Sequence, residues 1–371
     1  MDGMTFNPSG EWPEADALSY DDGVKARVDH LYERVKDVVT PMEWPKFAPV
    51  IDAILRLKQA RGATILAHNY MTPEIFNCVG DITGDSLKLA QVAAEAEEDV
   101  IVQAGVHFMA ETAKILSPNK TVLIPDLEAG CSLASSITGA DVQRIKAAYP
   151  DLPIVTYVNT SAEVKAYSDI CCTSSNAVQV VEAAARQWGV DTVIMIPDEY
   201  LAKNVAAQTD IKILTWKGSC EVHEQFTPQD IDDLRAAHPD AIILTHPECP
   251  PDVMAKADYA GSTGAMAAYV KNQAPAKAIL ITECSMSDNV AVENPGVTFV
   301  KPCNLCPHMK RITLTGIYDA LRDMKHQVEV DPVIAAKARA SLQAMLDLPK
   351  ADTPPAFDTG KDAVAVPYVA V

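Results

Sequence analysis

The stretch VIDAILRLKQARGATILAHNY, residues 50–70, decides the fold, because its pattern of a helix followed by an apolar strand occurs three times. It returns as ADVQRIKAAYPDLPIVTYVN at residues 140–159 and as QDIDDLRAAHPDAIILTHPE at residues 229–248. One aspartate in each copy marks the interval: Asp52, Asp141 and Asp230. These aspartates lie 89 residues apart (141 − 52 and 230 − 141). Such a period suits a small α/β unit better than a solenoid repeat, so the sequence predicts a triplicated domain.

Within each copy, three short apolar runs alternate with helical patterns. In the first copy these runs are TILAHNY, DVIVQAG and TVLIPD. The runs lack polar alternation, which is typical of parallel strands that are covered on both faces. Strands that alternate with helices favour right-handed crossovers. We therefore predict an α/β protein in which three pseudo-symmetric, three-layer αβα domains with short parallel sheets surround a common centre.

Five segments are expected along the chain. They are an N-terminal helical extension (1–46), α/β repeats 1 (47–135), 2 (136–224) and 3 (225–325), and a C-terminal helix and tail (326–371). The helical pattern DGVKARVDHLYERVKDVV is expected to pack across the triplicated body. The helix after Cys306 is expected to close the third unit, and the tail, rich in Pro and Ala, to be ordered only where it docks.

Charge and composition exclude several classes of partner. The chain of 371 residues has 31 basic and 50 acidic residues and a net charge of −19, which argues against binding to nucleic acid or to an anionic membrane. It contains no long apolar run and no signal peptide pattern, so we expect a cytoplasmic protein. An odd number of cysteines in a reducing compartment does not suggest a disulfide framework. Five of them lie in or beside apolar runs and are interpreted as buried small side chains: Cys78, Cys171, Cys172, Cys249 and Cys284.

Three other cysteines recur once per repeat, each in a loop after the third predicted strand: Cys131, Cys220 and Cys306. The carboxyl ends of parallel strands share one edge, where ligands bind, so these thiols are expected to meet. Thiolates select zinc, copper(I) or iron–sulfur clusters, and three of them leave a metal position free for a reactant. The alternative is that related units inherited a buried cysteine. Cys303, in the pair CNLC, is either a bystander or a reversible disulfide partner, because the register favours Cys306 as the ligand.

Polar side chains follow the first strand of each repeat at the same edge. They are His68 and Tyr70, then Tyr157 and Asn159, then His246 and Glu248. A single histidine in such a place is as often structural as functional, but three equivalent positions favour function. Glu248 would be a general base if burial raised its pKa.

Small hydroxyl residues stand at three equivalent helix starts: Ser86, Ser174 and Thr263. Each one alone is usually an N-cap. Three helix N-termini directed at one centre would instead bind carboxylate or phosphate oxygens through their backbone N–H groups.

These motifs together resemble one family. The segments AHNY, GDSLKLA, PDLEAGCSLA, TYVNTSAEVKA, CTSSNA, WKGSCEVHEQF, HPEC, GSTGAM and CNLCPHMK follow one another, from about residue 48 to about residue 325, as in quinolinate synthases, the A proteins of bacterial NAD biosynthesis. The resemblance implies three α/β domains around a 4Fe-4S cluster. It also implies condensation of iminoaspartate with dihydroxyacetone phosphate to give quinolinate, phosphate and water.

The resemblance assigns roles to individual residues of this sequence. Cys131, Cys220 and Cys306 would hold the cluster, with one iron open to substrate as a Lewis acid. The implied substrate-binding residues are His68, Ser86, Tyr157, Asn159, Ser174, His246, Glu248 and Thr263. The implied catalytic residues are Tyr70, Tyr157, His246 and Glu248, of which Tyr70 and Glu248 match proton-transfer positions. The implied partners are small-molecule substrates, with a functional link to L-aspartate oxidase or aspartate dehydrogenase.

Three alternatives stay open at this point. One is another iron–sulfur hydro-lyase that acts on a small dicarboxylate without phosphate release. A second is an iron–sulfur sensor or carrier, in which the histidines, tyrosines and Glu248 would be idle. A third is zinc in place of the cluster.

Overall fold

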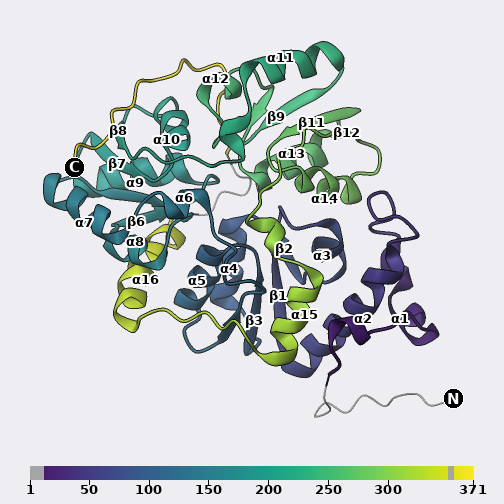
Figure 1. The fold of residues 1–371 in the computed structure, drawn as a ribbon. Helices are drawn as coiled ribbons and strands as arrows, with labels where there is room; N and C mark the ends of the chain where they lie inside the picture. The colour runs from purple at the N-terminus through teal and green to yellow at the C-terminus, as the bar shows by residue number, and fades with distance from the viewer. Residues whose placement is uncertain (1–11, 350–354) are drawn as a thin grey trace.

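Three four-stranded parallel sheets form the body of the protein in a computed structural model that describes residues 12–349 and 355–371 (Figure 1). The first sheet has the order β2-β1-β3-β4, and the others repeat it as β6-β5-β7-β8 and β10-β9-β11-β12. The strands are β1 (Ala63–His68), β2 (Ile82–Gly84), β3 (Val100–Ala104), β4 (Thr121–Leu123), β5 (Ile154–Tyr157), β6 (Ile170–Cys172), β7 (Thr192–Ile196), β8 (Lys212–Thr215), β9 (Ile242–Thr245), β10 (Tyr259–Ala260), β11 (Lys277–Ile281) and β12 (Thr298–Val300). This confirms the predicted α/β class with three αβα units. The limits of the five predicted segments stay a prediction, and residues 1–11 of the extension and 350–354 of the tail lie outside the described residues.

Each sheet has one strand more than we predicted. The added edge strands β2, β6 and β10 are two or three residues long, too short for a periodic pattern. Before each of them an aspartate carboxylate accepts a backbone N–H group of the central strand at 2.8–2.9 Å, as between Ile65 and Asp81. Each aspartate also forms an ion pair with a basic residue of the helix that precedes the central strand. The pairs are Lys58–Asp81, Lys146–Asp169 and Arg235–Asp258. The triplication therefore extends to the side chains that attach each edge strand.

Helices cover the sheets on both faces (Figure 1). The longer ones in the three units are α2 (Trp44–Arg61), α4 (Ser86–Glu95), α5 (His107–Leu116), α7 (Gly139–Ala148), α9 (Ala177–Trp188), α10 (Glu199–Ala206), α11 (Pro228–Ala237), α13 (Thr263–Gln273) and α14 (Ser285–Glu293). Short helices that we did not predict lead to the edge strands: α3 (Pro73–Cys78), α8 (Ala162–Tyr167) and α12 (Pro251–Met254). The central strands are buried as expected, with Ile65, Leu66 and Ala67 fully shielded from solvent.

Two helices pack elsewhere than predicted. The N-terminal helix α1 (Asp22–Tyr32) follows a short 3-10 helix, η1 (Ala15–Ala17), and packs against α2 of the first unit, not across the body. Arg27 of α1 binds the Asp52 carboxylate with two N–H groups, at 2.5 and 2.8 Å. The helix after Cys306, α15 (Leu314–Asp323), does not close the third unit, because it also packs against α2. The apolar stripe of α15 did not reveal which unit it would cover.

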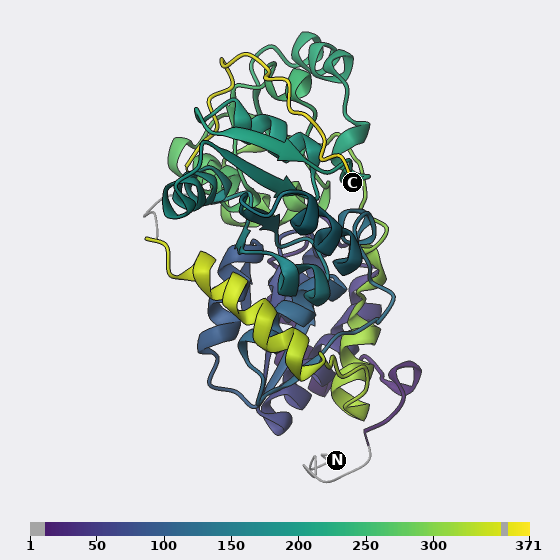
Figure 2. The ribbon, with the colours of Figure 1, turned by 90° about the vertical axis from the view of Figure 1, so that its left-hand side faces the viewer.

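The C-terminal segment links the units together. Helix α16 (Pro332–Leu346) contacts α5 of the first unit and α8 and β6 of the second, and Figure 2 shows it lying diagonally across the body. The tail then pairs with two sheet edges, since Phe357 N–H donates to Ala260 O and Val369 N–H donates to Thr215 O, each at 2.9 Å. The described part of the tail thus docks along edges that the sheets leave open, which we did not predict; that the tail is ordered only where it docks stays a prediction.

Candidate active site

The carboxyl ends of the three central strands open onto one central cavity of about 70 Å³. His68 ends β1, Tyr157 ends β5, and His246 directly follows β9. All twelve predicted site residues line this cavity: His68, Tyr70, Ser86, Cys131, Tyr157, Asn159, Ser174, Cys220, His246, Glu248, Thr263 and Cys306. Chemically different side chains from all three units, which the threefold pattern in the sequence indicated, therefore line one cavity.

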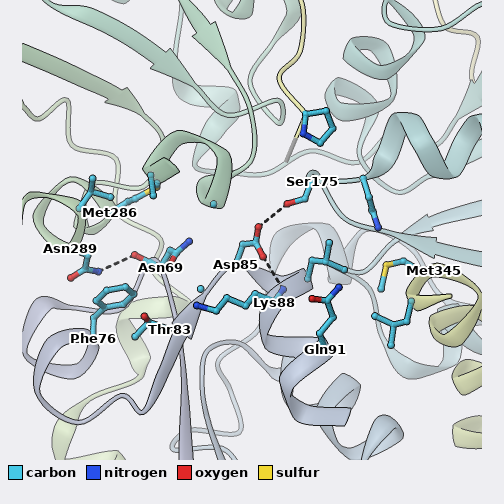
Figure 3. A pocket seen from close by; sticks show the side chains of 18 of the residues that line it. Asn69, Phe76, Thr83, Asp85, Lys88, Gln91, Ser175, Met286, Asn289 and Met345 are labelled. Carbon is cyan, nitrogen blue, oxygen red and sulfur yellow. Dashed lines mark hydrogen bonds between the residues drawn. The ribbon is translucent and has the colours of Figure 1, made fainter. Parts of the chain in front are cut away.

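A larger cavity of about 420 Å³ adjoins the central one at Asp85 and Ser175. Ser175 Oγ donates to Asp85 Oδ2 at 2.7 Å (Figure 3). The rest of the lining of this larger cavity is mostly apolar and amide side chains, among them Phe76, Met286 and Asn289. Among the described residues, no cysteine or histidine lines the larger cavity. The reactive groups are thus concentrated in the smaller cavity.

A short helical turn follows each of the three cavity cysteines, directly after Cys131 and after two intervening residues for Cys220 and Cys306. The turns are α6 (Ser132–Ser135) after Cys131, η2 (His223–Gln225) after Cys220 and η3 (Met309–Arg311) after Cys306. In each loop the backbone N–H groups two and three residues further on lower the pKa of the thiol, and Met309 N–H donates to Cys306 Sγ at 3.5 Å; these groups belong to Leu133 and Ala134, Val222 and His223, His308 and Met309. Such N–H donors favour the thiolate form of a cysteine, which is the form that binds metals.

Burial nevertheless raises the pKa of all three thiols, that of Cys131 to about 12. Among the described residues, the cavity lining contains no lysine or arginine that could neutralise the thiolates. A cation bound between the sulfurs would supply the missing positive charge. The donor set, three soft sulfurs with backbone N–H groups directed at them, suits iron–sulfur or zinc chemistry.

The remaining cysteines lie outside the cavity. Cys78, Cys171, Cys172 and Cys249 are free and buried, as predicted. Cys284 is also buried, but it is more than a small apolar side chain, because it forms a disulfide with Cys303. Of the two hypotheses for Cys303, bystander or disulfide partner, the structure shows the disulfide partner.

A closed ring of contacts joins the three cysteine loops. Between the first and second loops, Ser132 Oγ donates to Ser219 O at 3.2 Å and accepts from Glu221 N–H at 3.1 Å. Between the second and third loops, His308 Nε2 lies 2.9 Å from Glu221 Oε1. Arg311 closes the ring through ion pairs with two acidic residues of the first loop: Asp126 at 3.0 Å and Glu128 at 2.5 Å. The ring fixes the three thiols relative to one another.

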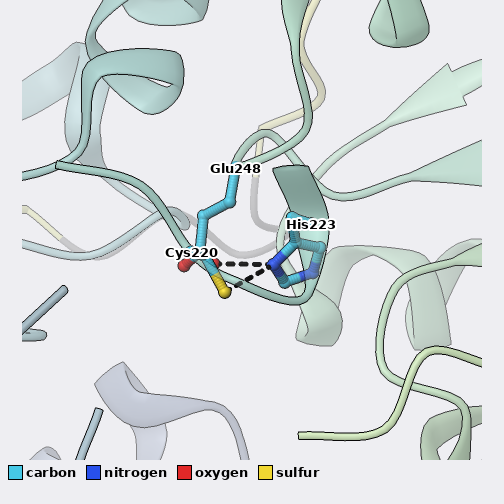
Figure 4. Close-up of side chains that lie close together, drawn as sticks. All are labelled: Cys220, His223 and Glu248. Carbon is cyan, nitrogen blue, oxygen red and sulfur yellow. Dashed lines mark hydrogen bonds and ion pairs between the residues drawn. The ribbon is translucent and has the colours of Figure 1, made fainter. Parts of the chain in front are cut away.

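Glu248 lies at the centre of a buried network (Figure 4). Its Oε1 accepts from Tyr157 OH at 2.5 Å and from Asn159 Nδ2 at 3.5 Å, and its Oε2 lies 2.8 Å from His223 Nδ1. Burial raises the pKa of this carboxyl, but electrostatic interactions with the nearby His223 and His246 side chains and the hydrogen bonds from His223 and Tyr157 outweigh burial. The pKa of Glu248 is therefore lowered, so the condition that we set for a general base, a pKa raised by burial, is not met. The carboxylate is ionised at neutral pH.

The network continues to the other side of the cavity. His223 Nε2 is 2.9 Å from Thr282 Oγ1 and 3.4 Å from Tyr70 OH, and the two hydroxyls are 2.6 Å apart. Tyr70 and Glu248 are thus joined through His223 and Thr282, which is a continuous path for a proton.

His68 and His246 are oriented in the same way in two units. A backbone N–H two residues later, of Tyr70 or of Glu248, donates to Nδ1 at 3.2–3.3 Å, so the ring proton of the neutral imidazole is on Nε2. Burial lowers the pKa of His68 to about 4 and that of His246 to about 3. Both rings are therefore neutral at pH 7, and each presents an Nε2–H donor.

These lowered pKa values predict a loss of stability in acid. A histidine with a folded-state pKa below its unfolded value of 6.5 contributes stability above pH 6.5 and loses it as the pH falls, because only the unfolded chain takes up the proton. At pH 5 each of the two histidines should lower the free energy of unfolding by about 2 kcal/mol relative to pH 8. Urea unfolding at both pH values should show a smaller loss in the His68→Gln/His246→Gln double variant. Equal losses in the two proteins would contradict the prediction.

The hydroxyl residues at the helix starts are not the N-caps. Asp85 caps α4 and Ser262 caps α13, so Ser86 and Thr263 occupy the first position of each helix. Ser174 stands three residues before α9, and its Oγ lies 3.3 Å from His246 Nε2. Ser86 and Thr263 are therefore not used as caps, although Thr263 Oγ1 accepts from Asn69 Nδ2 at 2.9 Å, and the three hydroxyls line the cavity.

Sequence reasoning missed His223. It lies three residues after Cys220 in the motif CEVH and is 1% exposed, and its side chain stacks on His246 with ring centroids 4.7 Å apart. The C-x-x-H spacing beside a predicted metal ligand was a usable signal. Asp85, Glu221, Thr282 and His308 were also missed, since no pattern in the sequence connects them with the cavity.

Taken together, the fold and the cavity define an enzyme made of three related α/β units with its reactive groups at the shared centre. The sequence matches the family described as Quinolinate synthetase A protein over residues 52–347. The chain belongs to this family, which confirms the resemblance seen in the motifs.

Relatives of high identity cover most of the chain. A quinolinate synthase of Caulobacter vibrioides is 60% identical over 338 residues, which span 91% of this chain and 92% of the relative. Quinolinate synthase 2 of Mesorhizobium japonicum is 63% identical over 316 residues, spanning 85% and 96% of the two chains. A quinolinate synthase of Xylella fastidiosa is 62% identical over 301 residues, spanning 81% and 88%.

Proposed function

We propose that this enzyme is a quinolinate synthase of NAD biosynthesis and that it condenses iminoaspartate with dihydroxyacetone phosphate to quinolinate, phosphate and two waters. The observation that carries the proposal is the meeting of three thiols, two neutral histidines, Glu248 and three hydroxyls in one cavity of a chain from this family. The names of the relatives at about 60% identity support it.

The three thiols fit a cluster. Cys131, Cys220 and Cys306 would hold it, because they come from equivalent loops, accept N–H hydrogen bonds and need a cation to ionise. A 4Fe-4S cluster with three cysteine ligands supplies a Lewis-acidic iron with one position open to substrate.

The polar wall suits anionic substrates. The Nε2–H groups of His68 and His246 and the hydroxyls of Ser86, Ser174 and Thr263 would donate to carboxylate and phosphate oxygens. Neutral histidines would serve here as hydrogen-bond donors that add no net charge to the cavity. Asn159 Oδ1 is buried without a hydrogen-bond partner, so it would accept from an N–H or O–H group of the substrate.

The Glu248 carboxylate would act as the base, because it is ionised at neutral pH and can accept a proton, although its lowered pKa makes it a weaker base than an ordinary glutamate. Two dehydrations require protons to leave carbon or nitrogen and reach departing oxygens. Glu248 could take such a proton, Tyr157 and His223 hold its two oxygens, and the path through His223 and Thr282 connects it with the Tyr70 hydroxyl. Tyr70 would then donate to a leaving group on the opposite side of the cavity.

The function is tested by product analysis under anaerobic conditions. The iron-loaded enzyme, given iminoaspartate and dihydroxyacetone phosphate, should form quinolinate and phosphate in equal amounts, and none when dihydroxyacetone phosphate is omitted. Hydration or dehydration of a dicarboxylate without quinolinate would favour the hydro-lyase alternative. An iron-loaded protein without either activity would favour the sensor or carrier.

The ring of loop contacts should control how tightly the iron is held. Ser132→Ala removes two hydrogen bonds between loops, worth about 1–2 kcal/mol together, so iron should pass to a chelator about 5–30-fold faster. The matched control is Ser136→Ala, because Ser136 Oγ donates to Leu133 O within the same loop. Release followed by the cluster absorbance at equal rates in both variants would count against the role of the ring.

Two further points stay proposals: which enzyme supplies the unstable iminoaspartate, and where in the cell the protein is located. We propose a functional link to L-aspartate oxidase or aspartate dehydrogenase, since either reaction makes iminoaspartate. A cytoplasmic location rests on the sequence features given above. Among the described residues, no helix combines the length and the apolar character needed to cross a membrane.

A further inference from the structure

Three unlike donor atoms form a compact group on one side of the central cavity (Figure 4). They belong to Cys220, His223 and Glu248 and lie within 4.8 Å of one another. His223 Nδ1 is 2.8 Å from Glu248 Oε2 and 3.2 Å from Cys220 Sγ. The side chains of His223 and Glu248 are 1% and 5% exposed. Cys220 and His223 come from one loop, whereas Glu248 follows a strand of the third unit, so only the fold brings the group together.

We propose that the chain without its cluster binds one zinc-like divalent ion at Cys220, His223 and Glu248, with a water or a substrate atom as the fourth ligand. Sulfur, imidazole and carboxylate are the ligands that zinc prefers, and three protein ligands with one open position are typical of reactive zinc sites. A tetrahedral ion would hold these atoms about 3.3–3.6 Å apart, given the usual bond lengths. The two contacts of His223 Nδ1, at 2.8 and 3.2 Å, would lengthen by about half an ångström to admit the ion, and Cys220 Sγ and the Glu248 carboxylate, which lie within 4.8 Å of one another, would settle at about 3.5 Å.

The surroundings favour a cation at this point. Glu248 and a deprotonated Cys220 carry two negative charges, and in the described part of the chain no lysine or arginine lines the cavity. The outer side of His223 is also fixed, since its Nε2 contacts Thr282 Oγ1 at 2.9 Å. A hydrogen bond on the far nitrogen orients an imidazole for metal binding through the near one. Tyr157 OH holds the other carboxylate oxygen of Glu248 at 2.5 Å.

The site shares Cys220 with the cluster of the proposed function, and it also occupies Glu248. Zinc and the cluster would therefore exclude each other, and zinc would compete with cluster assembly. This competition rests on the proposed function, whereas binding of zinc to the cluster-free chain does not. The ligand set differs from a zinc ion held by the three cysteines, because Cys131 and Cys306 take no part.

The test uses the full-length chain after removal of iron, titrated with Zn²⁺ by calorimetry and with Co²⁺ by absorption spectroscopy. One ion per chain should bind, with the spectrum of a tetrahedral site that includes a thiolate. His223→Gln and Cys220→Ser should each weaken binding by about 100-fold or more, since loss of an outer partner alone costs 10–100-fold. The controls His107→Gln, which changes a histidine outside the lining of the central cavity, and Cys131→Ser should bind within about 3-fold of the original chain. The cluster-loaded chain should bind no ion at this site.

Two results would overturn the proposal. One is equal loss of binding in Cys131→Ser, Cys306→Ser and Cys220→Ser together with full binding in His223→Gln, which would place the ion among the three thiols. The other is absence of stoichiometric binding by a metal-free chain whose circular dichroism shows it to be folded.

Competition is tested separately by adding iron and sulfide to the zinc-loaded and the metal-free chain. Zinc should slow the appearance of the cluster absorbance by at least about 10-fold, and a chelator should restore it. An unchanged rate would overturn the competition. Failure of the enzyme to form quinolinate would refute the proposed function and leave the zinc titration unaffected, so the two failures are distinguishable.

Discussion

Replacing Glu248 by glutamine is expected to lower kcat for quinolinate formation by about 10²–10⁴-fold, the usual contribution of a positioned general base. The amide oxygen can still accept the hydrogen bond from Tyr157, so the shape of the cavity should persist. The amide cannot take up a proton, whereas the carboxylate is ionised at neutral pH because His223, His246 and Tyr157 lower its pKa. The measurement is quinolinate formed per cluster in an anaerobic single-turnover assay.

Glu111→Gln is the matched control for this prediction. Glu111 is a partly buried glutamate whose Oε2 accepts the N–H of Ala162 at 2.9 Å, and it does not line the central cavity. Its variant should keep the kcat of the original enzyme. A Glu248→Gln enzyme that retains its iron and works within about 3-fold of the original would show that proton transfer does not depend on this carboxylate.

Replacing any one of Cys131, Cys220 and Cys306 by alanine is expected to abolish stable iron binding and to lower quinolinate formation by about 10³-fold or more, since a Lewis-acidic metal contributes several kcal/mol. Each loop supplies a single thiol to the cavity, so the remaining two cannot replace the missing ligand. Iron and sulfide analysis of anaerobically purified protein, with the absorbance of the cluster, measures the effect.

Two buried thiols elsewhere provide the controls. Cys78→Ala and Cys172→Ala change cysteines of α3 and β6 that do not line the cavity, and each should cost about 1 kcal/mol of stability while leaving iron and activity in place. Full iron content in a variant that lacks a cavity cysteine would refute the proposed ligand set. Zinc in place of iron in the original chain would refute the cluster.

The positions of the twelve predicted site residues could be read from the sequence because they depend on local order. Parallel strands place their carboxyl ends at a common edge, and a residue that directly follows a strand cannot lie far from that edge. His68, Tyr157 and His246 illustrate this, since each ends or follows the first strand of its unit. The roles of these residues remain proposals.

The pKa of Glu248 could not be predicted from the sequence in the same way. The pKa of Glu248 depends on whether the upward effect of burial or the downward effect of two histidines is larger. One of these histidines, His223, comes from the preceding unit. Nothing in the order of residues indicates that His223 contacts Glu248, because they lie 25 positions apart (248 − 223). The loop, α11 and β9 lie between them, so only the meeting of two units brings them together. The sequence therefore could not show whether the condition for a general base, a raised pKa of Glu248, would be met.

By itself, the sequence determined the threefold α/β plan, the strand ends at which reactive residues lie and the family, because repeats and strand periodicity are properties of neighbouring residues. Only the tertiary structure decided that α15 covers the first unit, that the tail pairs with the edges of two sheets, that Cys284 meets Cys303 and that the cysteine loops form a ring. These features depend on contacts between distant segments. Which of several compatible surfaces an apolar stripe or a charged side chain meets is fixed by the packing of the whole chain.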